Sequence, residues 1–202
     1  LTGYQTTTCF TDITQNLINS GVSNSSYQAV NGGPSTIIPV ITSVIFHPEN
    51  HLKAWVTFTG YEPTAKVWAT NDGGNTWFNA DPNGTLNNLP VNDIVFQKGT
   101  NDRIYIGTDA GIYYRDNSSN TWTKFCNFPN VMVTELKINY CMGKLRAATF
   151  GRGVWEGNLL GSNGSIGSDA LEISTNITWN TSRGIDRNIR VKPGGTLNIT
   201  GA

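Results

Sequence analysis

Two histidines four residues apart form the first pattern in this sequence that could do chemistry. On a helix, His47 and His51 would stand at a spacing that lets both imidazoles bind one metal ion. Pro48 and Asn50 lie between them and favour a turn, in which the two side chains do not converge. We therefore expect a turn and no metal site here. The sequence also contains no phosphate-binding glycine loop, no Cys/His metal set and no Ser-His-Asp order, so we expect no cofactor.

The composition narrows the class of protein. Of 202 residues, 38% are hydrophobic and 10% aromatic, which suffices for a sizeable core, whereas only 14% are charged. Fourteen basic and fourteen acidic side chains balance, so nucleic acid is not an expected partner. No apolar run approaches the roughly 20 residues that span a bilayer, so we expect no membrane span. The many Asn, Thr, Ser and Gly residues beside Val, Ile and aromatic runs favour β structure and are typical of secreted proteins.

The ends and the cysteines give two further expectations. The chain opens on Leu1 without the pattern of a signal peptide, so we interpret it as an internal portion of a longer, processed polypeptide. Cys9, Cys126 and Cys141 are odd in number and allow at most one bridge, with Cys126 and Cys141 the nearest pair. The favoured alternative is three buried thiols that act as small hydrophobes.

A repeated pattern predicts the architecture. Three segments alternate apolar and polar residues after a polar start, as a strand with one buried face does: residues 42–46, 92–96 and 134–138. Second strands are expected to follow each of them: residues 54–58, 104–108 and 145–149. The last two lead through a bend of small residues into a third strand with aromatic residues, at 110–113 and 152–155. The segments therefore read as homologous units of antiparallel strands.

Residues 70–77 contain the strongest local motif. Asp72 is followed by two glycines that can adopt positive φ, which predicts a tight hairpin turn. Written as Ser/Thr-x-Asp-x-Gly-x-Thr-Trp, the motif is matched by five residues: Thr70, Asp72, Gly74, Thr76 and Trp77. A degenerate copy at 116–122 keeps Asn-Thr-Trp but has Asn117 and Ser119 where the first copy has Asp and Gly.

This motif is the Asp-box, and the sequence resembles the Asp-box β-propellers, also called BNR proteins, which include sialidases, sortilins and xyloglucan-degrading enzymes. In that family the box joins the third and fourth strands of a blade, away from the substrate face. The resemblance therefore gives the five matched residues a structural role. Residues 147–156 further resemble the closing blade of propellers in secreted bacterial surface proteins of the Bacteroidetes type.

The predicted fold class is all-β: a partial β-propeller of about three to four four-stranded blades, followed by the start of a right-handed β-helix or another β domain. Residues 1–158 would form the blades, with 7–13 as the outer strand of a preceding blade and the insert 21–39 either decorating one face or poorly ordered. Residues 159–169 read as a Gly/Ser linker. Residues 170–202 resemble the first rungs of a β-helix, with a β-sandwich as the alternative.

The resemblance also places the candidate site. In such propellers the starts of the innermost strands and the turns after the second strands share one face around the central channel, where Asp93, Asp109, Glu135 and Arg152 would then lie. Asp93 and Glu135 are candidates for a glycosidase acid and base, whereas Asp109 and Arg152 are binding candidates. Arg152 could instead be a blade-closing residue that bonds backbone carbonyls. Tyr61, in a Gly-Tyr-Glu-Pro loop, is the best candidate for an exposed aromatic that stacks on a sugar.

Two functions remain open on this basis. The first is a non-catalytic structural, adhesive or binding module of a large secreted or cell-surface protein, which presents a propeller face to glycan or protein partners. The remaining blades would then come from the rest of the polypeptide or from another chain. The alternative is a propeller-type glycoside hydrolase, sialidase-like or xyloglucanase-like, acting on extracellular polysaccharide. We favour the first, because no complete catalytic set can be placed on these residues.

Overall fold

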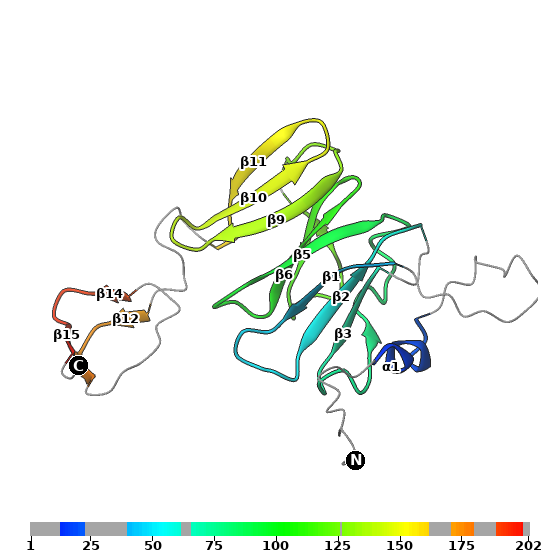
Figure 1. Cartoon of the computed structure of the whole chain (residues 1–202). Helices are drawn as coiled ribbons and strands as arrows, with labels where there is room; N and C mark the ends of the chain where they lie inside the picture. Colours follow the sequence, from blue (N-terminus) through cyan, green and yellow to red (C-terminus); the bar gives the residue numbers. More distant parts are fainter. Residues whose placement is uncertain are drawn as a thin grey trace, which may run out of the picture.

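Three antiparallel sheets follow one another along the chain in the computed structural model (Figure 1). The structure describes residues 13–22, 40–61, 66–125, 127–161, 171–179 and 189–199. Residues 7–12 of the expected outer strand at 7–13, most of the insert at 21–39, Cys9 and Cys126 lie outside these ranges. Within them, almost all regular structure is strand, as an all-β fold requires.

The first two sheets have four strands each, hydrogen-bonded in sequence order. The first contains β1 (Ile41–Phe46), β2 (Ala54–Phe58), β3 (Val67–Thr70) and β4 (Phe78–Asn79). The second contains β5 (Val91–Gln97), β6 (Arg103–Thr108), β7 (Gly111–Arg115) and β8 (Thr123–Lys124). The third has three described strands, β9 (Val133–Asn139), β10 (Lys144–Thr149) and β11 (Gly153–Asn158). The expected inner and second strands are thus confirmed, and the sheets are blades of a partial β-propeller.

The blades are equivalent in register as well as in order. Thr57 lies opposite Val67 in the first sheet, and Gly107 lies opposite Ile112 at the matching place in the second. Both innermost strands are interrupted after their first residue by a register shift, at Ile41 and at Val91. A shift of this kind, typical of a β-bulge, bends the strand and changes the direction of the side chain beside it.

Neighbouring sheets pack face to face through two apolar cores. The first and second sheets enclose a cluster that includes Trp55, Val67, Ile94, Ile104 and Trp122. The second and third sheets enclose another cluster that includes Tyr105, Phe125, Leu136, Leu145 and Ala147. Burying one large aliphatic side chain of this kind contributes roughly 1.5–3 kcal/mol. The inner strands β1, β5 and β9 consequently lie next to one another.

A short helix precedes the first sheet, in a chain whose composition favours β structure. Helix α1 (Thr14–Asn19) precedes β1, and its Leu17 packs with Val22 against Trp68 and Trp77 on the outward face of the first sheet. The six-residue helix is too short to be stable alone, so this packing must hold it. In the described part of the chain, no helix is long and apolar enough to cross a membrane.

The two ends of the blades carry different loops. In each sheet the turn after the second strand is hydrogen-bonded to the residue just before the inner strand. The Thr59 N–H donates to the Val40 carbonyl at 3.1 Å in the first sheet. The equivalent bonds run from Asp109 to Pro90 at 3.3 Å and from Phe150 to Met132 at 2.9 Å. These residues define one end, called here the upper end. The hairpins between first and second strands and the loops at 71–77 and 116–122 lie at the opposite, lower end, where Gly73 N–H bonds the carbonyl of Leu52.

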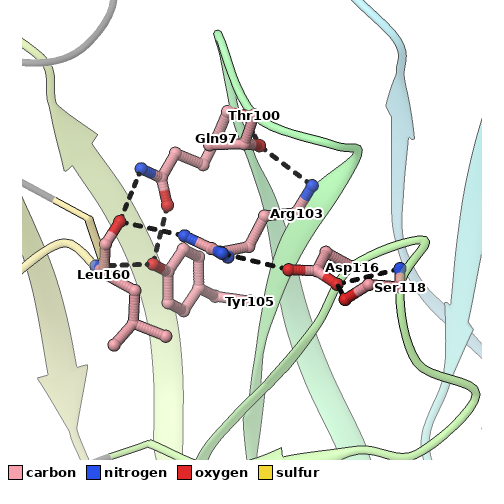
Figure 2. Close-up of polar contacts among 7 residues, drawn as sticks. All are labelled: Gln97, Thr100, Arg103, Tyr105, Asp116, Ser118 and Leu160. Atoms are coloured by element: carbon pink, nitrogen blue, oxygen red, sulfur yellow. Dashed lines mark hydrogen bonds and ion pairs between the residues drawn. The ribbon is translucent and has the colours of Figure 1, made fainter.

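The chain that leaves β11 is fixed to the second sheet (Figure 2). The Leu160 carbonyl accepts hydrogen bonds from Gln97 and Arg103, and its N–H donates to the Tyr105 hydroxyl at 3.1 Å. Arg103 also pairs with Asp116 at 3.0 Å, so one guanidinium joins the degenerate box to this chain. Burial, partly opposed by the bond to Leu160, raises the pKa of Tyr105 to about 12, so its hydroxyl keeps the proton that it donates to Gln97.

The strands expected beyond the linker are also present. They are β12 (Leu171–Ile173), β13 (Asn176–Trp179), β14 (Ile189–Val191) and β15 (Thr196–Ile199). β12 pairs with β14 and β13 with β15, both in parallel, as successive rungs of a β-helix do. Gly195 lies so close to the preceding rung that a Cβ would stand 2.3 Å from the Ile173 carbonyl oxygen, and only glycine fits there.

One of the three cysteines, Cys141, is not buried as expected. Cys141, in the turn between β9 and β10, is an exposed free thiol, so the expectation that all three thiols are buried is wrong for this residue. Turn residues expose their side chains, whereas the strand alternation that buries apolar residues stops at Asn139.

Candidate functional site

The two candidate carboxylates lie on neighbouring inner strands, Asp93 on β5 and Glu135 on β9. Asp93 accepts a hydrogen bond at 2.7 Å from the backbone N–H of Leu136, the residue next to Glu135. Glu135 is exposed and forms an ion pair with Lys137 at 2.9 Å. The first carboxylate thus joins two blades, whereas the second is a surface group.

Lys137 completes this cluster. The hydrogen bond to Glu135 raises the pKa of Lys137, burial opposes this, and the negative charges of Glu135 and Asp93 add to the increase. The ammonium therefore stays protonated beside both carboxylates. Glu135 is engaged by an ion pair and Asp93 by a backbone N–H, and such contacts suit a binding surface better than a general acid.

Asp109 lies at the same end through its contact with Asn92. The Asn92 amide donates both to Asp109 at 2.9 Å and to the Val133 carbonyl at 3.1 Å. Thr42 makes the equivalent bond one blade earlier, to the Val91 carbonyl at 2.8 Å. The residue after the first position of an inner strand therefore ties each blade to the next, and Asp109 supports that tie.

Exposed side chains surround these polar contacts at the upper end. Tyr61 is 71% exposed and Phe150 is 73% exposed, the latter in the turn position that Asp109 occupies in the second sheet. Arg152, in the same turn as Phe150, is exposed, and its carbonyl accepts the Trp155 indole N–H at 3.0 Å. The Arg152 guanidinium makes no hydrogen bond or ion pair with the described part of the chain, so nothing observed supports a blade-closing role.

The loop at 70–77 joins β3 to β4 and satisfies its own polar groups. Asp72 accepts bonds from the Thr70 hydroxyl at 2.8 Å and from the Thr76 N–H and hydroxyl at 2.9 and 2.6 Å. The Gly74 carbonyl accepts the Trp77 indole N–H at 3.1 Å. The Thr76 and Thr70 bonds lower the pKa of Asp72 from 3.8 to about 2. All five motif residues thus hold the turn at the lower end, far along the strands from the candidate carboxylates.

The shift at Asp72 predicts an acid-sensitive turn. Because the pKa is lower in the folded state, the carboxylate stabilises the fold fully above pH 3.8, and this contribution disappears as the pH falls toward 2. NMR titration of the Asp72 carboxyl should show a midpoint near 2, and an Asp72→Asn variant should lose stability at neutral pH but much less at pH 2. A midpoint near the ordinary value would contradict the hydrogen-bonded geometry.

A partly buried polar network at the lower end was not predicted from the sequence. Asp102 accepts bonds from Lys53 at 2.6 Å and Asn117 at 2.7 Å, and lies 3.0 Å from Nε2 of His47. It connects the turn of the first sheet with two turns of the second, beside a hollow of about 190 Å³. His47 is in a turn, as expected, and His51 lies in the same turn. A signal existed in the separation of His47 and Lys53 from Asp102 by about one blade length, but only the folded structure shows that these side chains converge.

Comparisons with known proteins add little beyond this geometry. No protein-family model and no curated protein matches the sequence. Among solved structures, the GH74 xyloglucanase from Xanthomonas campestris is 12% identical with a TM-score of 0.48, over 65% of this chain and 22% of that chain. The extracellular domain of a putative one component system from B. thetaiotaomicron is 17% identical with a TM-score of 0.44, over 62% and 16%.

A third solved structure, the GH74 enzyme from Niastella koreensis, is 16% identical with a TM-score of 0.37, over 72% of this chain and 25% of that chain. This chain therefore spans a quarter or less of each of the three proteins. Similarity at this level carries no argument about activity, and the propeller arrangement described above is read from strand order, register and packing.

Proposed function

We propose that this chain is a non-catalytic binding part of a β-propeller in an extracellular or cell-surface protein, and that its upper end binds glycan or protein partners. The proposal rests on two features of the upper end. Tyr61 and Phe150 expose aromatic side chains there, and the Asp93 and Glu135 carboxylates are already engaged by Leu136 and Lys137. Exposed aromatics on turns held by a rigid scaffold are a common basis for recognition.

The proposal extends to the kind of propeller. The loop at 70–77, whose polar groups are hydrogen-bonded within the loop, supports an Asp-box (BNR), sortilin-like propeller. We propose that it belongs to a secreted bacterial surface protein of the Bacteroidetes type. Val44 and Phe46 leave apolar side chains exposed on the outward face of the first sheet. That face suits a further blade, and we expect the remaining blades to come from the rest of the polypeptide or from another chain.

A binding screen tests the upper end. We expect glycan or peptide arrays to detect ligands whose signal falls at least about tenfold in Tyr61→Ala or Phe150→Ala, because a stacked aromatic supplies much of the contact energy of a small ligand. Phe46→Ala is the matched control, since Phe46 is 65% exposed but lies at the lower end of β1. Equal loss in all three variants, or no binding at all, would contradict the proposal.

The alternative is a propeller-type glycoside hydrolase acting on extracellular polysaccharide. It is favoured by one observation, the presence of Asp93 and Glu135 on adjacent inner strands. Sialosides, xyloglucan and related glycans should be tested for turnover with the wild type, Asp93→Asn and Glu135→Gln. Turnover that is lost in both variants while their melting temperatures stay unchanged would replace the binding proposal with this one.

A further inference from the structure

The degenerate copy of the box differs from the first copy at two positions that normally hold the turn. Arg115 ends β7 as Thr70 ends β3, each seven residues before the box tryptophan. Asn117 takes the place of Asp72 two residues later. In the first copy, Thr70 and Asp72 bond each other at 2.8 Å and so keep their polar groups within the loop. The second copy has replaced both members of this pair.

In the second copy, both side chains make contacts outside their own turn. The Arg115 guanidinium donates to the Ala80 carbonyl of the first blade, and its central carbon lies 5.8 Å from the centroid of the Trp122 ring. The Asn117 amide donates to Asp102 at 2.7 Å. Both side chains line the hollow of about 190 Å³ at the lower end. The departures from the motif therefore build one wall of this hollow.

The opposite wall comes from the first sheet. Trp55, Ala69 and Phe78 are direct partners across β2, β3 and β4, so all three lie on the face that meets the second sheet. Trp55 is part of the core, whereas Phe78 is 46% exposed. The exposed side chain of Asn71 adds an amide where β3 ends. The hollow thus combines an aromatic surface with the amides of Asn71 and Asn117.

Arg115 lines this hollow without a carboxylate partner in the described part of the chain. The two carboxylates whose charges reach it, Asp81 and Asp116, are engaged elsewhere. Asp81 accepts two N–H groups of its own turn at 2.9 and 3.0 Å, and Asp116 pairs with Arg103 (Figure 2). Burial lowers the pKa of Arg115, against the attraction of these two charges. A cation that has lost water without gaining a close counter-charge favours an anionic ligand.

The lining leaves the hollow with one uncompensated positive charge. Asp102 is the one acid among the residues that line it, and Lys53 matches it at 2.6 Å, so the charge of Arg115 remains. A cavity of similar volume between the second and third sheets, beside β11 and Trp155, has mainly apolar walls. The positive hollow is therefore a feature of the first interface and not a general result of stacking two blades.

We propose that this hollow binds a hexuronate, the carboxylate-bearing sugar ring of an acidic polysaccharide, with the carboxylate on Arg115. A guanidinium binds a carboxylate through two parallel hydrogen bonds. A simple carboxylate would satisfy Arg115 alone, whereas Phe78 suits the apolar face of a sugar ring and the amides of Asn71 and Asn117 suit its hydroxyl groups.

The size of the hollow agrees with a single ring. An apolar cavity of roughly 150 Å³ holds a benzene-sized ring. A hollow of about 190 Å³ therefore admits one sugar ring. The site lies at the lower end, so this inference does not depend on the proposed binding role of the upper end.

Titration of uronates into the isotope-labelled full chain tests the site. The methyl glycosides of glucuronate and galacturonate should shift the NMR signals of the Arg115 Nε–H and of the Asn71 and Asn117 side-chain amides. Their uncharged methyl esters should bind at least about tenfold more weakly, because the charge that Arg115 faces is gone. Acetate and glutamate should also bind more weakly, because they lack the ring. Uronates that leave these signals unmoved, or acetate or glutamate binding as tightly as the uronates, would overturn the proposal.

Matched variants locate the binding. Arg115→Gln should weaken uronate binding at least about tenfold. Asn71→Asp should do the same, because it puts a negative charge beside the bound carboxylate at an exposed position that the fold tolerates. Arg146→Gln is the control, since it removes the same charge from an exposed pair with Glu156 on the third sheet and should leave the affinity unchanged.

Circular dichroism checks that each variant folds, and if Arg115→Gln does not, Asn71→Asp decides by itself. Equal losses in Arg115→Gln and Arg146→Gln would assign the binding to overall charge. Unchanged affinity in Asn71→Asp would place the binding outside this hollow. Either result would overturn the proposal.

Discussion

Replacing Trp77 by alanine is expected to lower the free energy of unfolding by about 3–5 kcal/mol, the range for truncating a buried aromatic. Trp77 is only 8% exposed, packs against Leu17 and Val22, and bonds the Gly74 carbonyl through its indole N–H. Its loss would leave a cavity under α1 and release the helix, which has no other large apolar anchor than Leu17. Urea unfolding followed by circular dichroism measures the change.

Trp155→Ala is the matched control for this prediction. Trp155 is 42% exposed and lines the open cavity beside β11, so its removal should cost about 1 kcal/mol or less. A large loss for Trp77→Ala with a small loss for Trp155→Ala would support the packing role of the box tryptophan. Equal losses, or an unchanged melting temperature for Trp77→Ala, would contradict it.

Asp102→Asn is expected to destabilise the fold by about 2–3 kcal/mol, because it removes the charge that Lys53 faces at 2.6 Å. The effect should stay below that of a fully buried pair, since the Lys53 side chain is 27% exposed. Asparagine also tolerates the positive φ of 51° at this position, so the backbone is not the cause of the loss. Urea unfolding at neutral pH measures the change.

The same carboxylate predicts a pH dependence. Burial alone would raise the pKa of Asp102, but the hydrogen bonds from Lys53 and Asn117 and the Lys53 charge outweigh it and hold the pKa below its usual value. Because the folded pKa is the lower one, this stabilisation is complete above the unfolded pKa, about 4, and is lost as the pH falls through the folded value. The stability difference between wild type and Asp102→Asn should therefore shrink in acid.

Glu135→Gln serves as the control for Asp102. It also removes a carboxylate from an ion pair, but Glu135 and Lys137 are both largely exposed, and such surface pairs contribute about 1 kcal/mol or less. If both variants lost equal stability, the ion pair between Asp102 and Lys53 would contribute no more to stability than a surface ion pair.

The inner and second strands could be predicted closely, and the physical reason is local. Residues 54–58 and 104–108 are strands as expected, because alternation of apolar side chains and punctuation by turn residues act within a few positions. The same holds for the turn at 70–77, where Asp72 bonds residues only two and four positions away. Helix α1 was missed for the opposite reason, since six residues carry too short a pattern and Leu17 depends on a distant sheet.

The candidate site could be predicted only in part. The sequence supported placing Asp93 and Asp109 near the starts of the inner strands, and the bonds to Leu136 and Asn92 bring them there. The sequence could not show that the Asp93 carboxylate accepts a hydrogen bond from the backbone of the neighbouring blade. Nor could it show that Phe150, which follows its second strand as Asp109 does, is 73% exposed, because side-chain exposure depends on how the blades stack.

The sequence by itself determined the all-β class, the repeated unit and the box that holds each complete blade, since these follow from short-range periodicity and turn chemistry. Only the tertiary structure decided which groups meet across blades: the convergence of His47, Lys53 and Asp102, and the cavity beside Trp155. Those contacts join residues about one blade apart, and their geometry is set by the packing of one sheet on the next rather than by any local preference of the chain.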